Sequence, residues 1–342
     1  MTATIALPPI DWDAATATGA RLVPVGPRVT PGEAAQLVAE LRECAVRAQP
    51  RVRETARIDA PTDTAPVLVV DRASWVRGNV ESTRGLLGGL GAPEDGTSGF
   101  SARASGAELG SVLAWLGTKV LGQFDPFHEP AGRLLLVAPN VLHAERQLGV
   151  DPHDFRLWVC LHEETHRVQF TAHPWLREHL RAEATGLLHN LDLTTPALTD
   201  LLRRLREDGN NVTLLDLIGP DAAATRGVIE RVTAVMSLLE GHADVVMDEV
   251  GPAVVGSVSQ IRRRFEQRRT GRGVDRLVRR LLGLDLKLAQ YRDGARFCRA
   301  VVDRVGFDGF NRVFASAEAL PTLAEIHDPG AWLRRQGFPG VG

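Results

Sequence analysis

The chain contains the pattern His-Glu-x-x-His at His162-Glu163-Glu164-Thr165-His166. In a helix, residues four apart lie on one face, so the two imidazoles can reach a single metal ion while Glu163 lies beside the ion's open position. This arrangement is typical of catalytic zinc sites. Glu163 would be the general base that takes a proton from a zinc-bound water and later returns it. The pattern therefore predicts a zinc-dependent hydrolase.

A catalytic zinc site of this kind needs a third protein ligand. We expect it to be Glu240 or His242 of a downstream helix. The two residues flank the apolar stripe of this helix on opposite sides, so their positions relative to the stripe do not favour either one. Asp244 follows Glu240 by one helical turn and could accept the second ring N–H of a ligating histidine. This favours Glu240 as the ligand and Asp244 as the outer partner. His242 is the next candidate ligand and a candidate donor to the oxyanion.

Tyr291 is the only tyrosine of the chain. A tyrosine near such a site can stabilise the negative oxygen that forms in the transition state. The more common role for one tyrosine in a helical segment is a half-buried side chain with its hydroxyl bonded to the backbone. We keep Tyr291 as a weak candidate catalytic residue and favour the structural role.

The elements around the pattern must hold the two histidines in register. Asp151 can cap a helix that begins at Pro152, because proline suits the first helical position, and Pro174 limits its far end. A helix over 152–172 places the pattern in its middle. Two short apolar runs, 66–71 and 132–138, indicate strands, and the second could be an edge strand beside the substrate.

The sequence after residue 173 has mainly helical periodicity. We therefore predict an α+β, predominantly helical fold with a small sheet in the N-terminal half. Residues 1–30 are expected to form an extended arm and 31–342 a single domain. That domain can be divided into a lobe over 31–172, with the sheet and the pattern, and a helical lobe over 173–342.

The bulk composition excludes several classes of protein. Apolar residues make up 44% of the 342 residues and charged residues 24%, with a net charge of -2, which is typical of a globular protein and gives no global attraction to nucleic acid. The three cysteines are far apart, which argues against disulfides and a cysteine zinc site. The first ten residues do not resemble a signal peptide, and no apolar run reaches the length of a membrane helix. We expect a cytoplasmic protein.

An arginine-rich segment allows a second interpretation. Its basic residues could bind an acidic partner, although a solvated charged face is the more common explanation. The alternative function is thus a catalytically silent, zinc-stabilised scaffold that binds a protein or nucleic acid. The arginines concerned are Arg262, Arg263, Arg264, Arg268, Arg269, Arg272, Arg276, Arg279 and Arg280.

The pattern His-Glu-x-x-His followed by Glu240-x-x-x-Asp244 resembles the gluzincin metallopeptidases. Over nearly the whole chain, the sequence is similar to the zincin-like metallopeptidase family of high-GC bacteria, whose genes often lie beside deazaflavin-coenzyme biosynthesis genes. The resemblance implies a zincin fold, a bound zinc ion and a peptidase or hydrolase activity, but no particular substrate; the gene neighbourhood implies no chemistry. With the residues of the site, it favours an enzyme that cleaves a peptide or amide bond in a peptide or protein substrate. The phrases that carry it are 11–13, 69–72, 158–163, 240–244 and 297–302.

Overall fold

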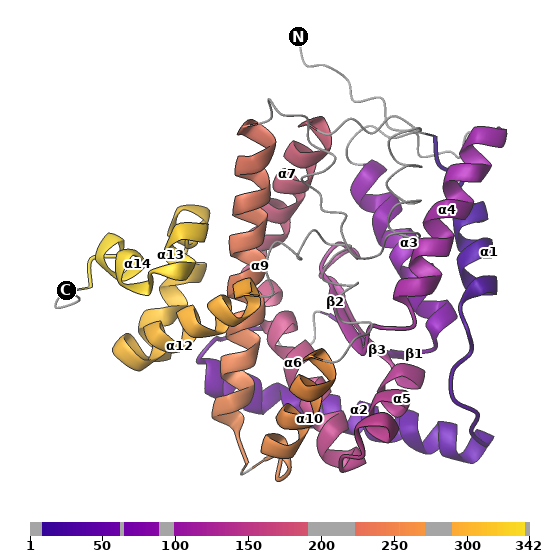
Figure 1. Cartoon of the computed structure of the whole chain (residues 1–342), viewed down its shortest axis with the longest axis horizontal. Coiled ribbons are helices and arrows are strands. Elements are labelled where there is room, and N and C mark those ends of the chain that lie inside the picture. Colours follow the sequence, from indigo (N-terminus) through magenta and orange to yellow (C-terminus); the bar gives the residue numbers. More distant parts are fainter. Residues whose placement is uncertain are drawn as a thin grey trace.

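The computed structural model describes residues 9–61, 65–88, 99–190, 223–252, 254–270 and 289–338. Within these ranges, the side chains of residues 188–190, 223–224, 265–270 and 289–292 are not described. Helices dominate, and a small sheet lies between two groups of them (Figure 1). None of the helices in the described ranges is both long and apolar enough to cross a membrane.

The elements follow one another along the chain with the strands confined to the first half. The strands are β1 (Val67–Val70), β2 (Gly122–Asp125) and β3 (Arg133–Val137). The helices before residue 150 are α1 (Trp12–Leu22), α2 (Pro31–Ala56), α3 (Arg72–Gly88), α4 (Phe100–Leu116) and α5 (Ala138–Leu148). The later helices are α6 (Pro152–Ala172), α7 (Trp175–Asn190), α9 (Ala223–Val250), α10 (Val258–Thr270), α12 (Ala289–Phe310), α13 (Leu323–His327) and α14 (Pro329–Arg335), with short 3-10 turns η2 (Asn311–Phe314) and η3 (Ala317–Ala319). The predicted α+β, predominantly helical fold is confirmed.

The sheet has the strand order β1-β3-β2, with β1 parallel and β2 antiparallel to β3. Successive side chains of β3 point to opposite faces. Leu134 and Leu136 pack into a core shared with α2, α6 and α9, whereas Leu135 and Val137 pack into a second core with α1, α3 and α4. Figure 1 shows these two groups of helices on opposite sides of the sheet. The sheet therefore separates the helix with the His-Glu-x-x-His pattern from the N-terminal helices.

The expected edge strand over 132–138 is instead the central strand β3. Every residue of β3 is buried, which matches the apolar run that follows Arg133 and the partner strands on both sides. The edge beside α6 is β2, and its short sequence Gly-Gln-Phe-Asp carries no clear strand signal. The prediction of strand character at 66–71 and 132–138 is correct, but the assignment of the edge is wrong.

The N-terminal segment also differs from the expected extended arm. Residues 12–22 form α1, whose N-terminus is capped by Asp11, and Trp12, Ala15 and Gly19 are buried. Small residues at the contact allow α1 to pack very closely against α4. A Cβ added at Gly110 would lie 2.3 Å from the carbonyl oxygen of Ala15. The segment is thus part of the second core.

Helix α6 has the bounds that the sequence predicts. Asp151 accepts a hydrogen bond from the backbone N–H of Asp154 at 2.9 Å, and Pro152 is the first helical residue. The helix packs against α2 and α9, and most of its side chains are buried. Its middle turn, which carries the His-Glu-x-x-His pattern, is therefore held rigidly between other helices.

Helix α9 is fixed in turn by a backbone contact with α12. A Cβ added at Gly241 would lie 2.2 Å from the carbonyl carbon of Gly294, and one added at Gly294 would lie 2.1 Å from the carbonyl oxygen of Ser237. Both positions therefore require glycine, since the two helices touch through their backbones. Gly241 directly follows Glu240, so this crossing positions the expected third ligand.

Candidate metal centre

The two histidines of α6 point to one place, as their four-residue spacing predicts. Their Nε2 atoms are 3.2 Å apart, and both rings are half-buried. The rings meet edge to face, with centroids 4.7 Å apart and planes at 88°. Each imidazole therefore presents the same nitrogen to a common point.

Glu240 reaches this point from α9, 74 residues further along the chain. One of its carboxylate oxygens lies 3.4 Å from Nε2 of His162, and the other lies 3.7 Å from Nε2 of His166. His162, His166 and Glu240 form the one group of three or more potential metal ligands found within the described ranges. The structure brings together the set that the sequence favours, and His242 is not a member of this group.

The separations of these donor atoms fit a zinc ion. Ligand atoms about 2.0 to 2.2 Å from zinc at tetrahedral angles are about 3.3 to 3.6 Å from one another. The distances of 3.2, 3.4 and 3.7 Å between the three side chains are close to this range. Two imidazoles and one carboxylate also leave one position of a tetrahedron for water or substrate, as in catalytic zinc sites.

The ionisable groups of the site influence one another strongly. Burial alone would lower the pKa of His162, but its hydrogen bond to Glu240 and the charges of Glu240, Glu163 and Asp244 outweigh burial and raise the pKa to about 9. Burial and the charge of His162 lower the pKa of His166, against the opposing charge of Glu240. The three carboxylates therefore produce a negative potential that favours a cation at this point.

Glu163 is buried beside the first residue of the edge strand. A Cβ added at Gly122 would lie 2.5 Å from Cγ of Glu163, so only glycine allows β2 to come this close. Burial raises the pKa of Glu163 to about 7; the charge of His162 lowers it and that of Glu240 raises it further. A carboxyl group with a pKa near neutrality can both accept and donate a proton, which suits a general base.

The outer nitrogens of the two histidines have partners that the sequence did not indicate. Nδ1 of His166 lies 3.0 Å from Oε1 of Gln169, and Nδ1 of His162 lies 3.3 Å from the sulfur of Met247. Asp244, the expected outer partner, acts on His162 through its charge, and its backbone oxygen accepts a hydrogen bond from Arg262. The i, i+3 spacing of His166 and Gln169 was the signal that could have indicated Gln169.

His242 lies in the core, and this position does not favour its candidate role as an oxyanion donor, which stays a prediction. Its side chain is fully buried, stacks on Phe310 with ring centroids 5.0 Å apart, and packs near Phe314. Its Nδ1 lies 2.9 Å from Nε2 of Gln169. Burial, with smaller effects from the charges of His166 and His173, lowers its pKa to about 3. Phe310 of α12 and Phe314 of η2 therefore cover the side of α9 that carries His242.

Two other candidate groups lie partly or wholly outside the described residues. Tyr291 belongs to α12, but its side chain is among those not described. In the arginine-rich segment, Arg262 pairs with Asp248 at 2.7 Å, while Arg263 and Arg264 are exposed. The side chains from Arg268 to Arg280 lie outside the described residues, so the proposed binding face stays a prediction.

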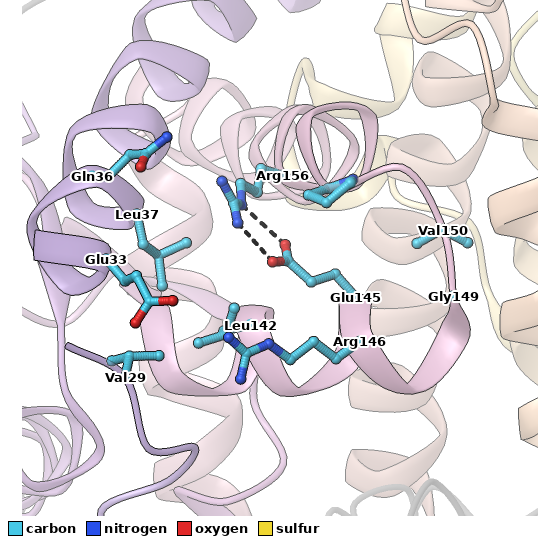
Figure 2. Close-up of a pocket in the computed structure, with 11 residues that line it drawn as sticks. Val29, Glu33, Gln36, Leu37, Leu142, Glu145, Arg146, Gly149, Val150 and Arg156 are labelled. Atoms are coloured by element: carbon cyan, nitrogen blue, oxygen red, sulfur yellow. Dashed lines mark hydrogen bonds and ion pairs between the residues drawn. The ribbon is translucent and has the colours of Figure 1, made fainter.

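A hollow of about 370 Å³ lies between α2, α5 and the start of α6, and none of the metal-centre residues lines it (Figure 2). Arg156 and Glu145 face each other there through two hydrogen bonds of 2.9 and 2.6 Å. Arg156 also pairs with Glu40. Because its guanidinium group is neutralised by two carboxylates, we interpret the hollow as a structural feature rather than an anion site.

Comparisons with known proteins agree with this geometry. A family model for zincin-like metallopeptidases matches residues 10–333. The chain is also similar to a protein from Chloroflexus aurantiacus, whose crystal structure is described as a "putative hydrolase with a novel fold". The two share 30% sequence identity and a TM-score of 0.70, over 97% of this chain and 100% of that chain. The search of curated proteins finds no match. Since the family model spans nearly the whole chain, the protein belongs to the zincin-like metallopeptidase family.

Proposed function

We propose that the protein is a zinc-dependent metallopeptidase that cleaves a peptide or amide bond. The observation that carries the proposal is the convergence of His162, His166 and Glu240, with one donor atom from each within 4.8 Å of the others, beside the buried carboxyl group of Glu163. A zinc ion held there would supply Lewis acidity and lower the pKa of a bound water.

Glu163 is the residue that moves the proton in this proposal. Hydrolysis adds water across the C–N bond: an oxygen of water bonds to the carbonyl carbon, and the bond to nitrogen breaks. Glu163 takes one proton from the attacking water and donates it to the leaving nitrogen. Its pKa of about 7 matches both steps near neutral pH. Tyr291 remains a proposed oxyanion donor.

The position of β2 supports a peptide as the substrate class. The N–H of Val137 donates to the carbonyl oxygen of Leu121 at 2.9 Å, directly beside the register pair Gly122 and Leu136. Bonded and non-bonded pairs alternate along antiparallel strands, so the N–H and C=O of Gly122 point away from β3. These outward-facing groups, next to Glu163, could pair with the backbone of an extended peptide.

The test compares wild-type protein with Glu163→Gln. Both are purified without added metal, their zinc content is measured by mass spectrometry, and both are incubated with a mixed peptide library. We expect equal zinc content and a loss of about 10²- to 10⁴-fold in cleavage, because the amide cannot accept the proton. Glu178→Gln, which alters an exposed glutamate of α7, is the matched control and should retain full activity.

Two outcomes would contradict the peptidase. If the wild-type protein is purified without stoichiometric zinc, the proposed zinc site is contradicted, and the peptidase mechanism with it. Zinc-loaded wild-type protein that cleaves no peptide in the library, but binds an acidic polymer in a salt-dependent manner, would instead favour the scaffold with an arginine-rich face.

A further inference from the structure

A buried glutamine connects the two helices that supply the metal ligands. Gln169 lies on α6, one turn after His166, and its side chain is fully buried. Its Oε1 is 3.0 Å from Nδ1 of His166. Its Nε2 is 3.0 Å from the backbone oxygen of Leu239 and 2.9 Å from Nδ1 of His242, both on α9. All the polar atoms of this amide are therefore in contact with groups around the metal centre.

The positions of the hydrogens in this network can be assigned by starting from the backbone carbonyl of Leu239. The carbonyl oxygen of Leu239 only accepts hydrogen bonds, so the amide nitrogen of Gln169 must face it. The amide oxygen then faces Nδ1 of His166, and an oxygen that only accepts requires a hydrogen on that nitrogen. In the neutral ring, Nε2 of His166 consequently carries a lone pair.

A second contact agrees with this assignment. The Nε2 atoms of His166 and His162 are 3.2 Å apart, which is a hydrogen-bond distance. The two nitrogens cannot both present a hydrogen to each other across this distance. At least one Nε2 must be bare, and the amide of Gln169 selects that of His166.

We propose that Gln169 is a positioning residue that keeps the hydrogen of His166 on Nδ1 and so holds the Nε2 lone pair toward the metal. The inference rests on the proposed function only in that His166 is taken as a ligand. Glutamine does here what a carboxylate or backbone carbonyl does for many zinc-binding histidines. Because the same amide bonds to Leu239, the residue before Glu240, it also ties the ligand of α9 to the ligands of α6.

The role of His242 follows from the same network. Gln169 has two amide hydrogens: one bonds to Leu239, and the other bonds to Nδ1 of His242. His242 therefore acts as a buried acceptor behind His166, stacked against Phe310. Its place in the core supports Gln169 and does not require contact with substrate.

The tautomer of His166 can be measured without metal and without an activity assay. Metal-free protein labelled with ¹⁵N-histidine is studied by long-range proton–nitrogen correlation NMR, and the signals of His166 are assigned by their loss in a His166→Gln variant. We expect a protonated Nδ1 and a bare Nε2 in the wild type. Gln169→Met, which keeps the side chain's length but has no hydrogen-bonding amide, should lose this fixed state.

Zinc affinity provides the second readout, by competition with a chelating indicator. We expect Gln169→Met to weaken zinc binding by about 10- to 100-fold. The matched control is Thr171→Val on the same helix, because Thr171 bonds only to the backbone oxygen of Arg167 in the described contacts. This variant should change neither the tautomer nor the affinity.

The inference is overturned if wild-type His166 carries its hydrogen on Nε2, a result that does not depend on the Gln169→Met variant. It is also overturned if folded Gln169→Met retains both the Nδ1 hydrogen and wild-type zinc affinity. Wild-type protein that binds zinc with the expected tautomer but cleaves no peptide would support the role of Gln169 and contradict the proposed peptidase. The two failures are thus distinguishable.

Discussion

At the scale of single residues, the metal centre is a crowded set of charges. His162 and His166 are one helical turn apart, and Glu240, Glu163 and Asp244 surround them with carboxylates. Without a metal, a proton on His162 can partly take the place of the missing cation, which is why its pKa is raised to about 9. Proton and zinc should therefore compete for this site, and zinc affinity should increase with pH.

This competition predicts how the stability of the zinc-free protein depends on pH. The pKa of His162 is about 9 in the folded state and about 6.5 in the unfolded state, so its pairing with Glu240 stabilises the fold fully below pH 6.5 and is lost as pH rises through 9. We expect the free energy of unfolding to fall between pH 7 and 9. Urea titrations in excess chelator measure this change.

The control for the pH prediction is Glu240→Gln, which removes the charge that raises the pKa of His162. Its free energy of unfolding should depend less on pH in the same interval. The pKa values of Glu163, about 7, and of His242, about 3, lie at or below the lower end of the interval. Equal pH dependence in the two proteins would contradict the pairing.

The grouping of the three candidate ligands could be predicted from the sequence, but the residues that support them could not. The spacing of His162 and His166 defines one helical face, and Glu240 was favoured by a nearby acid. The actual neighbours of Glu240 depend on how α9 packs against α12, and the periodicity of the sequence does not predict this packing. For that reason, the sequence did not indicate Gln169, which lies between His166 and His242 and contacts both.

At the scale of elements, the contact that matters most for the proposed function joins the edge strand β2 to helix α6. β2 begins at Gly122, whose Cα lies against the side chain of Glu163. The strand is four residues long and contains glycine and two polar residues, so it could not be recognised from the sequence. By contrast, β3 and α6 were predictable because an apolar run and an Asp-Pro cap mark them clearly.

Gly122→Ala tests this contact. The new Cβ would meet Glu163 at 2.5 Å, so the carboxyl group or the strand must move. A displacement near 1 Å from the reacting position can cost about 10²-fold in rate. We expect a 10- to 100-fold loss of kcat/KM on any peptide that the wild type cleaves, with zinc affinity nearly unchanged because the added Cβ lies against Glu163.

The matched substitution for this test is Gly85→Ala on α3. Among the described residues, no atom beyond the neighbouring turns of α3 lies within 4 Å of a Cβ placed there, so activity and stability should be retained. Wild-type kcat/KM in Gly122→Ala would show that Glu163 has room to adjust and that the close approach of β2 is not needed for catalysis.

At the scale of the whole molecule, the metal centre joins parts of the chain that are distant in sequence. The α6 ligands and Glu240 belong to helices that share the larger core with α2 and β3. A metal bound to all three side chains would connect these helices and stabilise the folded state by mass action. The global fold class was predictable from periodicity, whereas this connection depends on long-range packing.

Metal removal should therefore lower the melting temperature. At a free zinc concentration 1,000-fold above its dissociation constant, binding contributes about 4 kcal/mol to the folded state. We expect chelation to lower the melting temperature by several degrees, as measured by differential scanning calorimetry, and zinc to restore it. In Glu240→Gln, with one ligand replaced, the same treatment should have a smaller effect, and an equal effect would place the bound zinc elsewhere.

The glycine contact between α9 and α12 has a consequence for sequence variation. Gly241 and Gly294 meet backbone to backbone, so no side chain can adjust its rotamer to absorb a substitution there. Every larger residue must push the helices apart and carry Glu240 with them. In saturation mutagenesis, we expect substitutions of these two glycines to be tolerated as poorly as substitutions of His162 and His166, although glycine has no functional group.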